Sequence, residues 1–251
     1  MSKKPFTYGN CKDLAKDLIS EEFNYNIYQC VYPVRKGDIV LDLGASIGPF
    51  TYQIMDKASK VYAIEPLEEL QQTLYKNTVD QGYPVEVIQK VLHYDNIPVD
   101  FYDNCIIDGL DIRTCQGTTF NNFLKEYNID KIDFIKFDCE GGEYYLFRDE
   151  NMDFLRNNVR NLVGEFHISK PHEQVEFLYF KDKFLKKFPH FKVYSVNNVD
   201  IGWELQNYER SQYGTDQHGN VIHGKDFFNR YDEIIIHISN EKEGTGPGYA
   251  I

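Results

Sequence analysis

Short apolar runs alternate with helix-like segments along most of this chain, beginning near residue 38. Apolar runs of about four to eight residues bounded by turn residues are typical of buried strands, and apolar positions three and four apart are typical of helices. The pattern predicts strands at 39–43, 61–64, 85–91, 132–137, 161–166, 191–196 and 234–238. It predicts helices at 48–56 and around Leu67, Leu70 and Leu74.

Strands that alternate with helices restrict the topology. A strand, a helix and a further strand are joined by a right-handed crossover, so the early strands must be parallel. Helices then cover both faces of the sheet, which suits the nearly continuous apolar run at 132–135. The sequence therefore predicts a doubly wound α/β sheet of about seven strands.

The N-terminal residues, 1–33, precede this pattern. Leu14, Leu18 and Ile19 have helical spacing within 13–22. We expect a helical flank there, which acts either as a lid over the main fold or only as a flank.

The main domain is expected at 34–240, with two insertions. Residues 94–118 interrupt the alternation near the expected active face, and 99–102 could form a short extra strand within them. Residues 198–228 are long and polar, as functional loops or ordered flaps often are. The Gly-rich residues 241–251 are expected to be a flexible tail, because they cannot bury enough apolar surface to hold a structure.

Composition narrows the class of protein. The chain has 251 residues, of which 42% are hydrophobic, and a net charge of −12. This length can bury a full α/β core, and the negative charge disfavours a nucleic-acid partner. No apolar run approaches the roughly 20 residues that cross a bilayer, so we expect a soluble, cytoplasmic protein with no membrane partner. The five cysteines contain no C-x-x-C pair and are expected to be reduced thiols.

The strongest local motif is the run 40–48, in which a predicted strand ends in a Gly-rich turn that opens a helix. It lacks the glycine pattern of dinucleotide-binding folds and the Gly-Lys-Ser/Thr of phosphate-binding loops, so no phosphate cradle is indicated. Asp42 at the strand end could accept a hydrogen bond from an ammonium group, directly or through water. Glu65 ends the next strand, where a carboxylate can bind both hydroxyls of a ribose. These features favour S-adenosylmethionine, with S-adenosylhomocysteine as the product.

Leu92 and His93 follow the third predicted strand, where contacts to adenine are expected, although plain packing explains them equally well. The full set of cofactor contacts that we predict is Asp42, Gly44, Ala45, Ser46, Gly48, Glu65, Pro66, Leu92, His93 and Asp138.

Several ordered blocks resemble the FkbM family of methyltransferases. Residues 37–48 resemble its opening motif, 63–66 its ribose motif and 118–124 its helix before the next strand. Residues 132–143 read I-D-F-I-K-F-D-C-E-G-G-E and are similar to the family signature I-D-x-I-K-x-D-x-E-G-x-E. Residues 163–167 resemble the E-x-H strand of many members. Ser46, Cys139 and Gly142 depart from the common Asn, Val and Ala, but all three are small, so we expect cofactor binding to be kept.

The resemblance implies a class I, Rossmann-like methyltransferase fold, whose mostly parallel seven-stranded sheet has an antiparallel last strand. It also implies methyl transfer to a hydroxyl oxygen of a small-molecule or glycan acceptor, such as a sugar or a polyketide-type metabolite. The resemblance ends near Ile168, so acceptor selectivity is expected to lie beyond that residue.

An alcohol is a poor nucleophile, so methyl transfer requires a positioned acceptor and a group that takes its proton. Asp138 and Glu140 end one predicted strand, and Glu165 and His167 end its expected neighbour, each pair with the period of two that shares a face. We predict Asp138 or His167 as the general base, with Glu140 orienting the acceptor or the histidine. Lys136 is expected to pair with these carboxylates, catalytically or as a structural salt bridge.

Alternatives remain open from the sequence. The cluster of Asp, Glu and His could also bind a divalent metal that acidifies the hydroxyl, although we assign no metal ligand. A ribose 2′-O-methyltransferase of RNA is the nearest enzymatic alternative. A cofactor-binding module without catalysis, which binds a protein through 198–228, is the alternative from another class. The sequence does not predict the oligomeric state.

Overall fold

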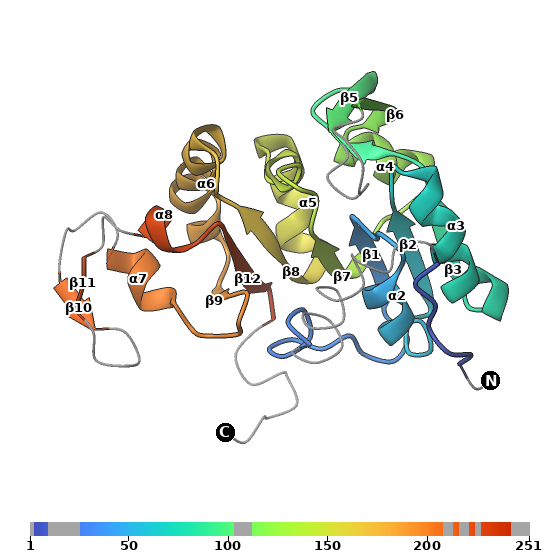
Figure 1. The fold of residues 1–251 in the computed structure, drawn as a ribbon, viewed down its shortest axis with the longest axis horizontal. Coiled ribbons are helices and arrows are strands. Elements are labelled where there is room, and N and C mark those ends of the chain that lie inside the picture. Colours follow the sequence, from blue (N-terminus) through green and yellow to red (C-terminus); the bar gives the residue numbers. More distant parts are fainter. Residues whose placement is uncertain are drawn as a thin grey trace.

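The computed structural model describes residues 3–9, 26–102, 112–207, 213–215, 221–223 and 227–241. Within these residues the chain forms a seven-stranded sheet in the order β3-β2-β1-β7-β8-β12-β9 (Figure 1). Its strands are β1 (Ile39–Leu43), β2 (Lys60–Ile64), β3 (Val85–Ile88), β7 (Ile132–Phe137), β8 (Val159–His167), β9 (His190–Ser195) and β12 (Glu233–Ser239). The helices are α2 (Pro49–Ile54), α3 (Glu68–Asn77), α4 (Phe120–Glu126), α5 (Met152–Asn157), α6 (Pro171–Lys183), α7 (Gly202–Asn207) and α8 (Phe227–Arg230).

The strand order reverses at β1. The chain first runs outward from β1 through β2 to β3, and it later returns to place β7 and β8 on the other side of β1. All of these neighbours are parallel, whereas β12 is antiparallel to both β8 and β9. The doubly wound sheet and the antiparallel last strand are therefore confirmed. Ligands of such sheets bind beyond the carboxyl ends of the strands at the point of reversal, which here lies between β1 and β7.

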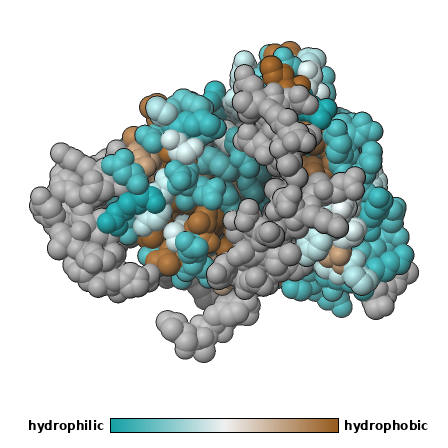
Figure 2. Space-filling model, viewed as in Figure 1, coloured by the Kyte–Doolittle hydropathy of each residue, from teal (hydrophilic) through white to brown (hydrophobic). Residues whose placement is uncertain are grey.

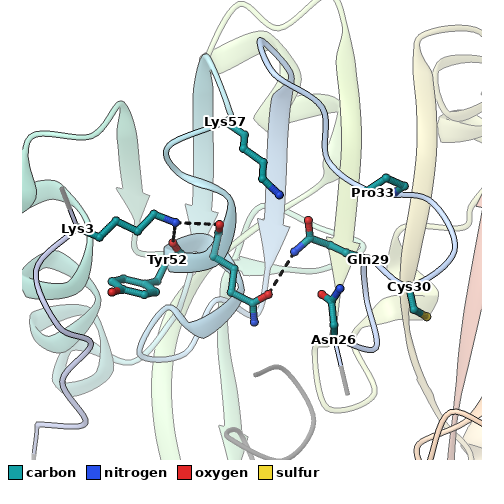
Figure 3. Close-up of a pocket in the computed structure, with 8 residues that line it drawn as sticks. Lys3, Asn26, Gln29, Cys30, Pro33, Tyr52 and Lys57 are labelled. Carbon is teal, nitrogen blue, oxygen red and sulfur yellow. Dashed lines mark hydrogen bonds between the residues drawn. The ribbon is translucent and has the colours of Figure 1, made fainter. Parts of the chain in front are cut away.

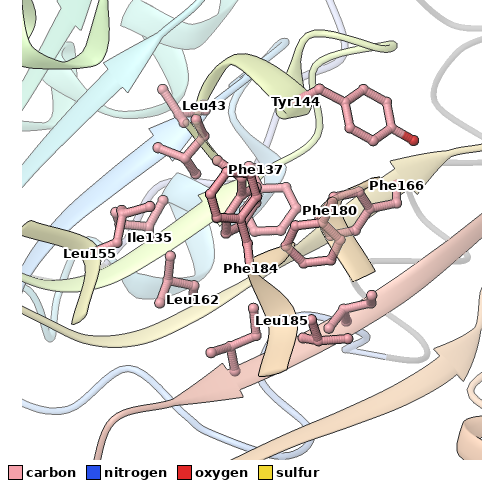
Figure 4. Packing of buried hydrophobic residues seen from close by; sticks show 14 of the residues in the cluster. Leu43, Ile135, Phe137, Tyr144, Leu155, Leu162, Phe166, Phe180, Phe184 and Leu185 are labelled. Carbon is pink, nitrogen blue, oxygen red and sulfur yellow. The ribbon is translucent and has the colours of Figure 1, made fainter. Parts of the chain in front are cut away.

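Alternate residues of each buried strand pack on opposite faces of the sheet. One face carries Phe137 and Phe166, which pack against Phe180 of α6 in an aromatic core (Figure 4). The Phe166 and Phe180 rings stack with centroids 4.3 Å apart. Full burial of each such ring contributes about 1.5–3 kcal/mol.

The opposite face is covered by α2 and by residues 26–34 of the N-terminal segment. Phe134 of β7 stacks there on Phe50 of α2, with ring centroids 5.8 Å apart. Ile27 and Val34 are buried in the same cluster. Residues 26–34 are therefore part of the core of this face.

The prediction of one strand at 85–91 is wrong in part. β3 ends at Ile88, and Val91–Leu92 forms a separate strand, β4, which pairs in parallel with β6 (Ile112–Thr118). The polar pair Gln89 and Lys90 interrupts the apolar run, so the chain leaves the main sheet there.

The extra strand predicted at 99–102 is confirmed as β5 (Pro98–Tyr102), which pairs antiparallel with β6 in a small sheet of order β4-β6-β5. Figure 2 shows a mainly hydrophilic surface on the viewed face, with apolar surface over this small sheet. Ile97 and Ile112 are among its exposed apolar side chains.

The second insertion contains α7, the start of α8 and two short strands that pair with each other, β10 (Tyr213–Thr215) and β11 (Val221–His223). The helix predicted at 13–22 and residues 242–251 of the predicted tail lie outside the described residues. The described cysteines, Cys30, Cys115 and Cys139, are free thiols. In the described part of the chain, no helix combines the length and the apolarity needed to span a membrane.

Gly44, directly after β1, allows the backbones that follow β1 and β7 to approach closely at the point of reversal. A Cβ atom at this position would lie 1.7 Å from the Asp138 carbonyl oxygen, and the residue has a φ of +73°. We predict that Gly44→Ala lowers the free energy of unfolding by about 4 kcal/mol or more, because a backbone clash adds to the strain of a left-handed residue.

Gly37→Ala is the matched control for this substitution. Gly37 also has a positive φ, +90°, but nothing lies within 4 Å of the point that a Cβ atom would occupy there. Gly37→Ala should lower the free energy of unfolding by about 1–2 kcal/mol, the cost of backbone strain alone. Urea unfolding of both variants measures the difference, and equal costs at the two positions would contradict the clash at Gly44.

Candidate active site

The turn that follows β1 is held against the end of β2. The backbone N–H groups of Gly44 and Ala45 both donate to the carbonyl of Ile64, at 3.0 and 2.9 Å. Gly48 directly precedes α2 as its N-cap with a φ of +88°, and a Cβ there would lie 2.4 Å from Leu74 Cδ1. Glycine is therefore needed at Gly48 both for its conformation and for the close packing of α3.

Glu65 directly follows β2 and accepts a hydrogen bond from this turn. Its Oε2 accepts from the backbone N–H of Ser46 at 2.8 Å, and its Oε1 accepts from that of Leu67 at 2.9 Å. Burial raises the pKa of Glu65 to about 7, against the lowering effect of the two backbone hydrogen bonds. Each carboxylate oxygen can accept a further hydrogen bond, so Glu65 fits the predicted role of binding ribose hydroxyls.

Asp42 lies deeper, and none of its surface is exposed. Its Oδ2 accepts a hydrogen bond from Thr51 Oγ1 at 2.7 Å, and its Oδ1 lies 3.4 Å from Lys136 Nζ. Lys136 Nζ also donates to the Gly44 carbonyl at 2.8 Å and lies 3.7 Å from Asp138 Oδ2. The expected pairing of Lys136 with carboxylates is confirmed, and the contact of Asp42 with the cofactor's ammonium group stays a prediction.

Leu92 and His93 lie where β4 leaves the main sheet. Leu92 is buried in the core, and the His93 ring lies against Tyr94 and Tyr145, with centroids 4.0 and 5.0 Å away. Tyr94 is 60% exposed, so this aromatic cluster has an open side. Pro66, directly after Glu65, is partly exposed. The contacts of these residues with adenine stay predictions.

The structure brings the three predicted catalytic residues together at the ends of β7 and β8. Asp138, Glu140 and His167 each offer a ligand atom, and these atoms lie within 4.8 Å of one another. The Asp138 backbone N–H donates to the Leu43 carbonyl at 3.0 Å, which fixes it beside the turn after β1. Glu140 has a φ of 52°, and its side chain is 63% exposed.

Glu143 lies behind His167 and was not predicted as a site residue. It is completely buried, and its Oε1 accepts from the His167 backbone N–H at 2.7 Å and lies 3.2 Å from the ring Nδ1. Burial by itself lowers the pKa of His167, but the hydrogen bond and charge of Glu143, with the charges of Asp138 and Glu140, raise it to about 11. Glu143 therefore favours the charged form of the His167 imidazole. Glu143 is the last residue of the family signature at 132–143, so this motif could have identified it as a site residue.

Two further acidic residues complete this cluster. Glu165 precedes His167 by two positions on β8, and Glu233 lies opposite His167 in the antiparallel register with β12. Glu165 is 5% exposed, and burial followed by the negative charge of Asp138 raises its pKa well above the usual range. Glu165, His167 and Glu233 form a second group of ligand atoms within 4.8 Å of one another.

Both groups have donors that suit a divalent cation, because carboxylates and imidazole are common ligands of such ions. The imidazole must lose a proton to bind a metal, so a metal would have to displace the charge interactions of His167. The arrangement can serve either metal binding or proton transfer.

A pocket of about 540 Å³ lies elsewhere, and its lining contains none of the predicted site residues (Figure 3). It is lined by Lys3, Asn26, Gln29, Cys30, Pro33, Tyr52, Gln53 and Lys57.

Comparison with known proteins identifies the family. The sequence model of the methyltransferase FkbM domain matches residues 42–194, more than half of the chain. The chain therefore belongs to the FkbM family of methyltransferases, whose methyl donor is S-adenosylmethionine. None of the curated proteins matches this chain significantly in sequence.

Solved structures with a similar fold are distant in sequence. An FkbM methyltransferase from Methylobacillus flagellatus is 14% identical, with a TM-score of 0.48. The match covers 90% of this chain and 54% of the other, so this chain spans about half the length of that protein. A methyltransferase-like protein from Streptococcus mutans, solved in complex with SAH, is 12% identical with a TM-score of 0.43 and coverages of 95% and 99%. An rRNA methylase from Streptococcus thermophilus is 11% identical with a TM-score of 0.44 and coverages of 88% and 93%.

The residues present fit the cofactor of the family. Glu65 keeps acceptor capacity on both carboxylate oxygens, and the turn after β1 places backbone groups beside it. The carboxylates near Asp138 supply negative charge for the cationic sulfonium and ammonium groups.

We predict that cofactor affinity depends on the ionisation of Glu65. Each Glu65 oxygen already accepts one backbone hydrogen bond, so only the ionised carboxylate keeps a further lone pair on both oxygens for the two ribose hydroxyls. Binding should therefore strengthen as the pH rises through about 7. The Kd for S-adenosylmethionine should rise about tenfold from about pH 8 to about pH 6. Calorimetric titration at several pH values measures this dependence.

Glu65→Gln is the control, because the comparison cancels any titration of the cofactor itself. The variant should bind more weakly at high pH and should lack the part of the pH dependence due to Glu65. If the Kd of the variant and that of the wild type depended on pH in the same way, Glu65 would not be the group whose ionisation controls cofactor affinity.

Proposed function

We propose that this protein transfers the methyl group of S-adenosylmethionine to a hydroxyl oxygen of a small-molecule acceptor, a sugar, glycan or polyketide-type metabolite. The observation that carries this proposal is the position of Asp138. Its carboxylate lies at the point of strand reversal, beside the turn of the cofactor motif, and is 25% exposed. A cytoplasmic location is part of the same proposal.

Asp138 fits the role of general base better than His167 does. A protonated imidazole cannot accept a proton, and His167 is held in its charged form by Glu143. Asp138 is more exposed than Glu165, so an acceptor hydroxyl can reach it more easily. When bound, the cofactor would supply an electrophilic methyl group on a sulfonium, and S-adenosylhomocysteine would leave when the sulfur–methyl bond breaks. Asp138 takes the hydroxyl proton as the acceptor oxygen bonds to the methyl carbon.

His167 and Glu140 are proposed to place the acceptor. The Nε2 atom of His167 lies 3.6 Å from Glu140 Oε2 and 3.8 Å from Glu233 Oε2, so its charge orients two carboxylates at the site. The exposed Glu140 can accept a hydrogen bond from a second hydroxyl of the acceptor. Acceptors with neighbouring hydroxyls, such as sugars, use such bonds for orientation.

The aromatic cluster of His93, Tyr94 and Tyr145 supports a small acceptor with an apolar face. The open ring of Tyr94 can pack against a sugar or a polyketide ring. The net charge of −12 supports a small or neutral acceptor over RNA.

RNA ribose methylation is the enzymatic alternative, and Lys136 bears on it. A free lysine beside Asp138 could help to deprotonate a ribose hydroxyl, but Lys136 is 2% exposed and pairs with Asp42 and Asp138. Activity on RNA would fall steeply with added salt, whereas activity on a small neutral acceptor should change little. A module without catalysis would bind the cofactor and transfer no methyl group to any acceptor.

A metal-assisted reaction is a second chemistry that the same residues could support, because two groups of donors meet at His167. Treatment with a chelator followed by metal add-back distinguishes it from a reaction that uses Asp138 alone.

We predict that Asp138→Asn lowers kcat about 10²–10⁴-fold, because the amide cannot take the acceptor proton. The Kd for S-adenosylmethionine should change much less than kcat. Steady-state kinetics with an acceptor found by screening glycans and polyketides, together with calorimetry, measure both quantities. Asp182→Asn on α6 makes the same chemical change at an exposed ion pair and should leave both unchanged. Loss of cofactor binding with normal methyl transfer in Asp138→Asn would rule out Asp138 as the base.

A further inference from the structure

Tyr28 of the N-terminal segment reaches the proposed catalytic carboxylates from outside the family-matched region. Its hydroxyl lies 2.6 Å from Glu165 Oε1 and 3.2 Å from Asp138 Oδ2. We propose that Tyr28 is a positioning residue of the methyl transfer, which holds the Asp138 carboxylate in its reactive orientation. This inference rests on the proposed function, in which Asp138 takes the acceptor proton.

The segment that carries Tyr28 is fixed on both sides. Ile27 and Tyr28 are 1% and 2% exposed, and the Tyr28 ring makes an edge-to-face contact with Phe50 of α2 at 5.9 Å. On the outer side, Gln29 Nε2 donates to Gln53 Oε1 at 3.3 Å, at the end of α2 (Figure 3). Two neighbouring residues thus join this segment to α2, so the position of the phenol is determined by packing and by a polar contact.

The Tyr28 hydroxyl bridges two carboxylates, those of Glu165 and Asp138. A hydroxyl has one hydrogen and can donate it to one oxygen at a time, and the shorter distance is to Glu165. With its hydrogen on Glu165, the Tyr28 oxygen still offers a lone pair to Asp138. In that state it can accept a hydrogen bond from Asp138 after proton transfer. To donate to the ionised Asp138, the hydroxyl turns its hydrogen away from Glu165.

The Tyr28 ring also covers Lys136, whose Nζ lies 5.2 Å from the ring centroid. Lys136 Nζ lies 3.7 Å from Asp138 Oδ2, the same oxygen that the Tyr28 hydroxyl contacts. Asp138 is thus held by an ammonium group and a phenol from two different parts of the chain. Besides Tyr28, the charged and titratable groups that interact with Asp138 are Lys136, Cys139, Glu140, Glu165, His167 and Glu233.

The test is Tyr28→Phe, which removes the hydroxyl and keeps the ring over Lys136 and Phe50. We expect kcat to fall about 10- to 100-fold, the effect of losing a hydrogen bond to a charged group. The Kd for S-adenosylmethionine should change by less than about threefold, because Tyr28 acts through Asp138 and not on the cofactor. Kinetics with the acceptor found by the screen and calorimetry measure these values.

Tyr52→Phe is the matched control. Tyr52 lies on α2, and its hydroxyl donates to the Lys4 carbonyl at an exposed position, so the same deletion should leave kcat unchanged. Crystal structures of the wild type and Tyr28→Phe with S-adenosylhomocysteine give a readout that needs no acceptor. We expect the Asp138 carboxylate to turn away from its wild-type orientation in the variant.

The outcomes separate this inference from the proposed function. A wild type that methylates no acceptor would refute the proposed function, and the crystal structures would still decide the role of Tyr28. An unmoved Asp138 in Tyr28→Phe, or a kcat within about twofold of the wild type, would overturn the inference. A loss of kcat matched by an equal loss of cofactor affinity would also overturn it, because that pattern indicates a purely structural role.

Discussion

The buried ammonium of Lys136 is the interaction on which the rest of the site depends. It joins Asp42 on β1, the Gly44 carbonyl of the cofactor turn and Asp138 after β7, so one charge connects the three parts that meet at the point of strand reversal. Buried charges are costly to desolvate, and removing one partner of a buried pair costs about 3–5 kcal/mol because the other remains uncompensated. The close approach of β1 and β7, which only glycine permits at Gly44, brings these groups within reach of one another.

A second cation, His167, organises the acidic edge of the same site. Glu143 binds it from behind, while Glu140 and Glu233 lie on the other side of its ring. The carboxylates outnumber the cations there, so the site is suited to the positively charged methyl donor of the family. The left-handed conformation of Glu140 is costly for a residue with a side chain, and such strain persists where the surrounding structure requires it.

The sequence predicted the repeated strand-helix order, the doubly wound sheet and the meeting of Asp138, Glu140 and His167, because these follow from local periodicity and from a dense motif. It did not predict Tyr28, which is 110 positions before Asp138 and carries no local signal. The pairing of β4 with β6 was also missed, because apolar residues recur throughout 85–91 even though Glu86, Gln89 and Lys90 interrupt them. The charge of His167 could not be predicted either, since it depends on the burial of Glu143 directly behind the ring.

The most direct test of the account is the chemical position of the transferred methyl group. The purified protein would be incubated with S-adenosylmethionine labelled at the methyl carbon and with an acceptor from the screen, and the product would be examined by NMR. The account predicts the label on a hydroxyl oxygen of the acceptor with the wild type, and little or no labelled product with Asp138→Asn. A label on nitrogen or carbon, or equal labelling by the two proteins, would contradict it.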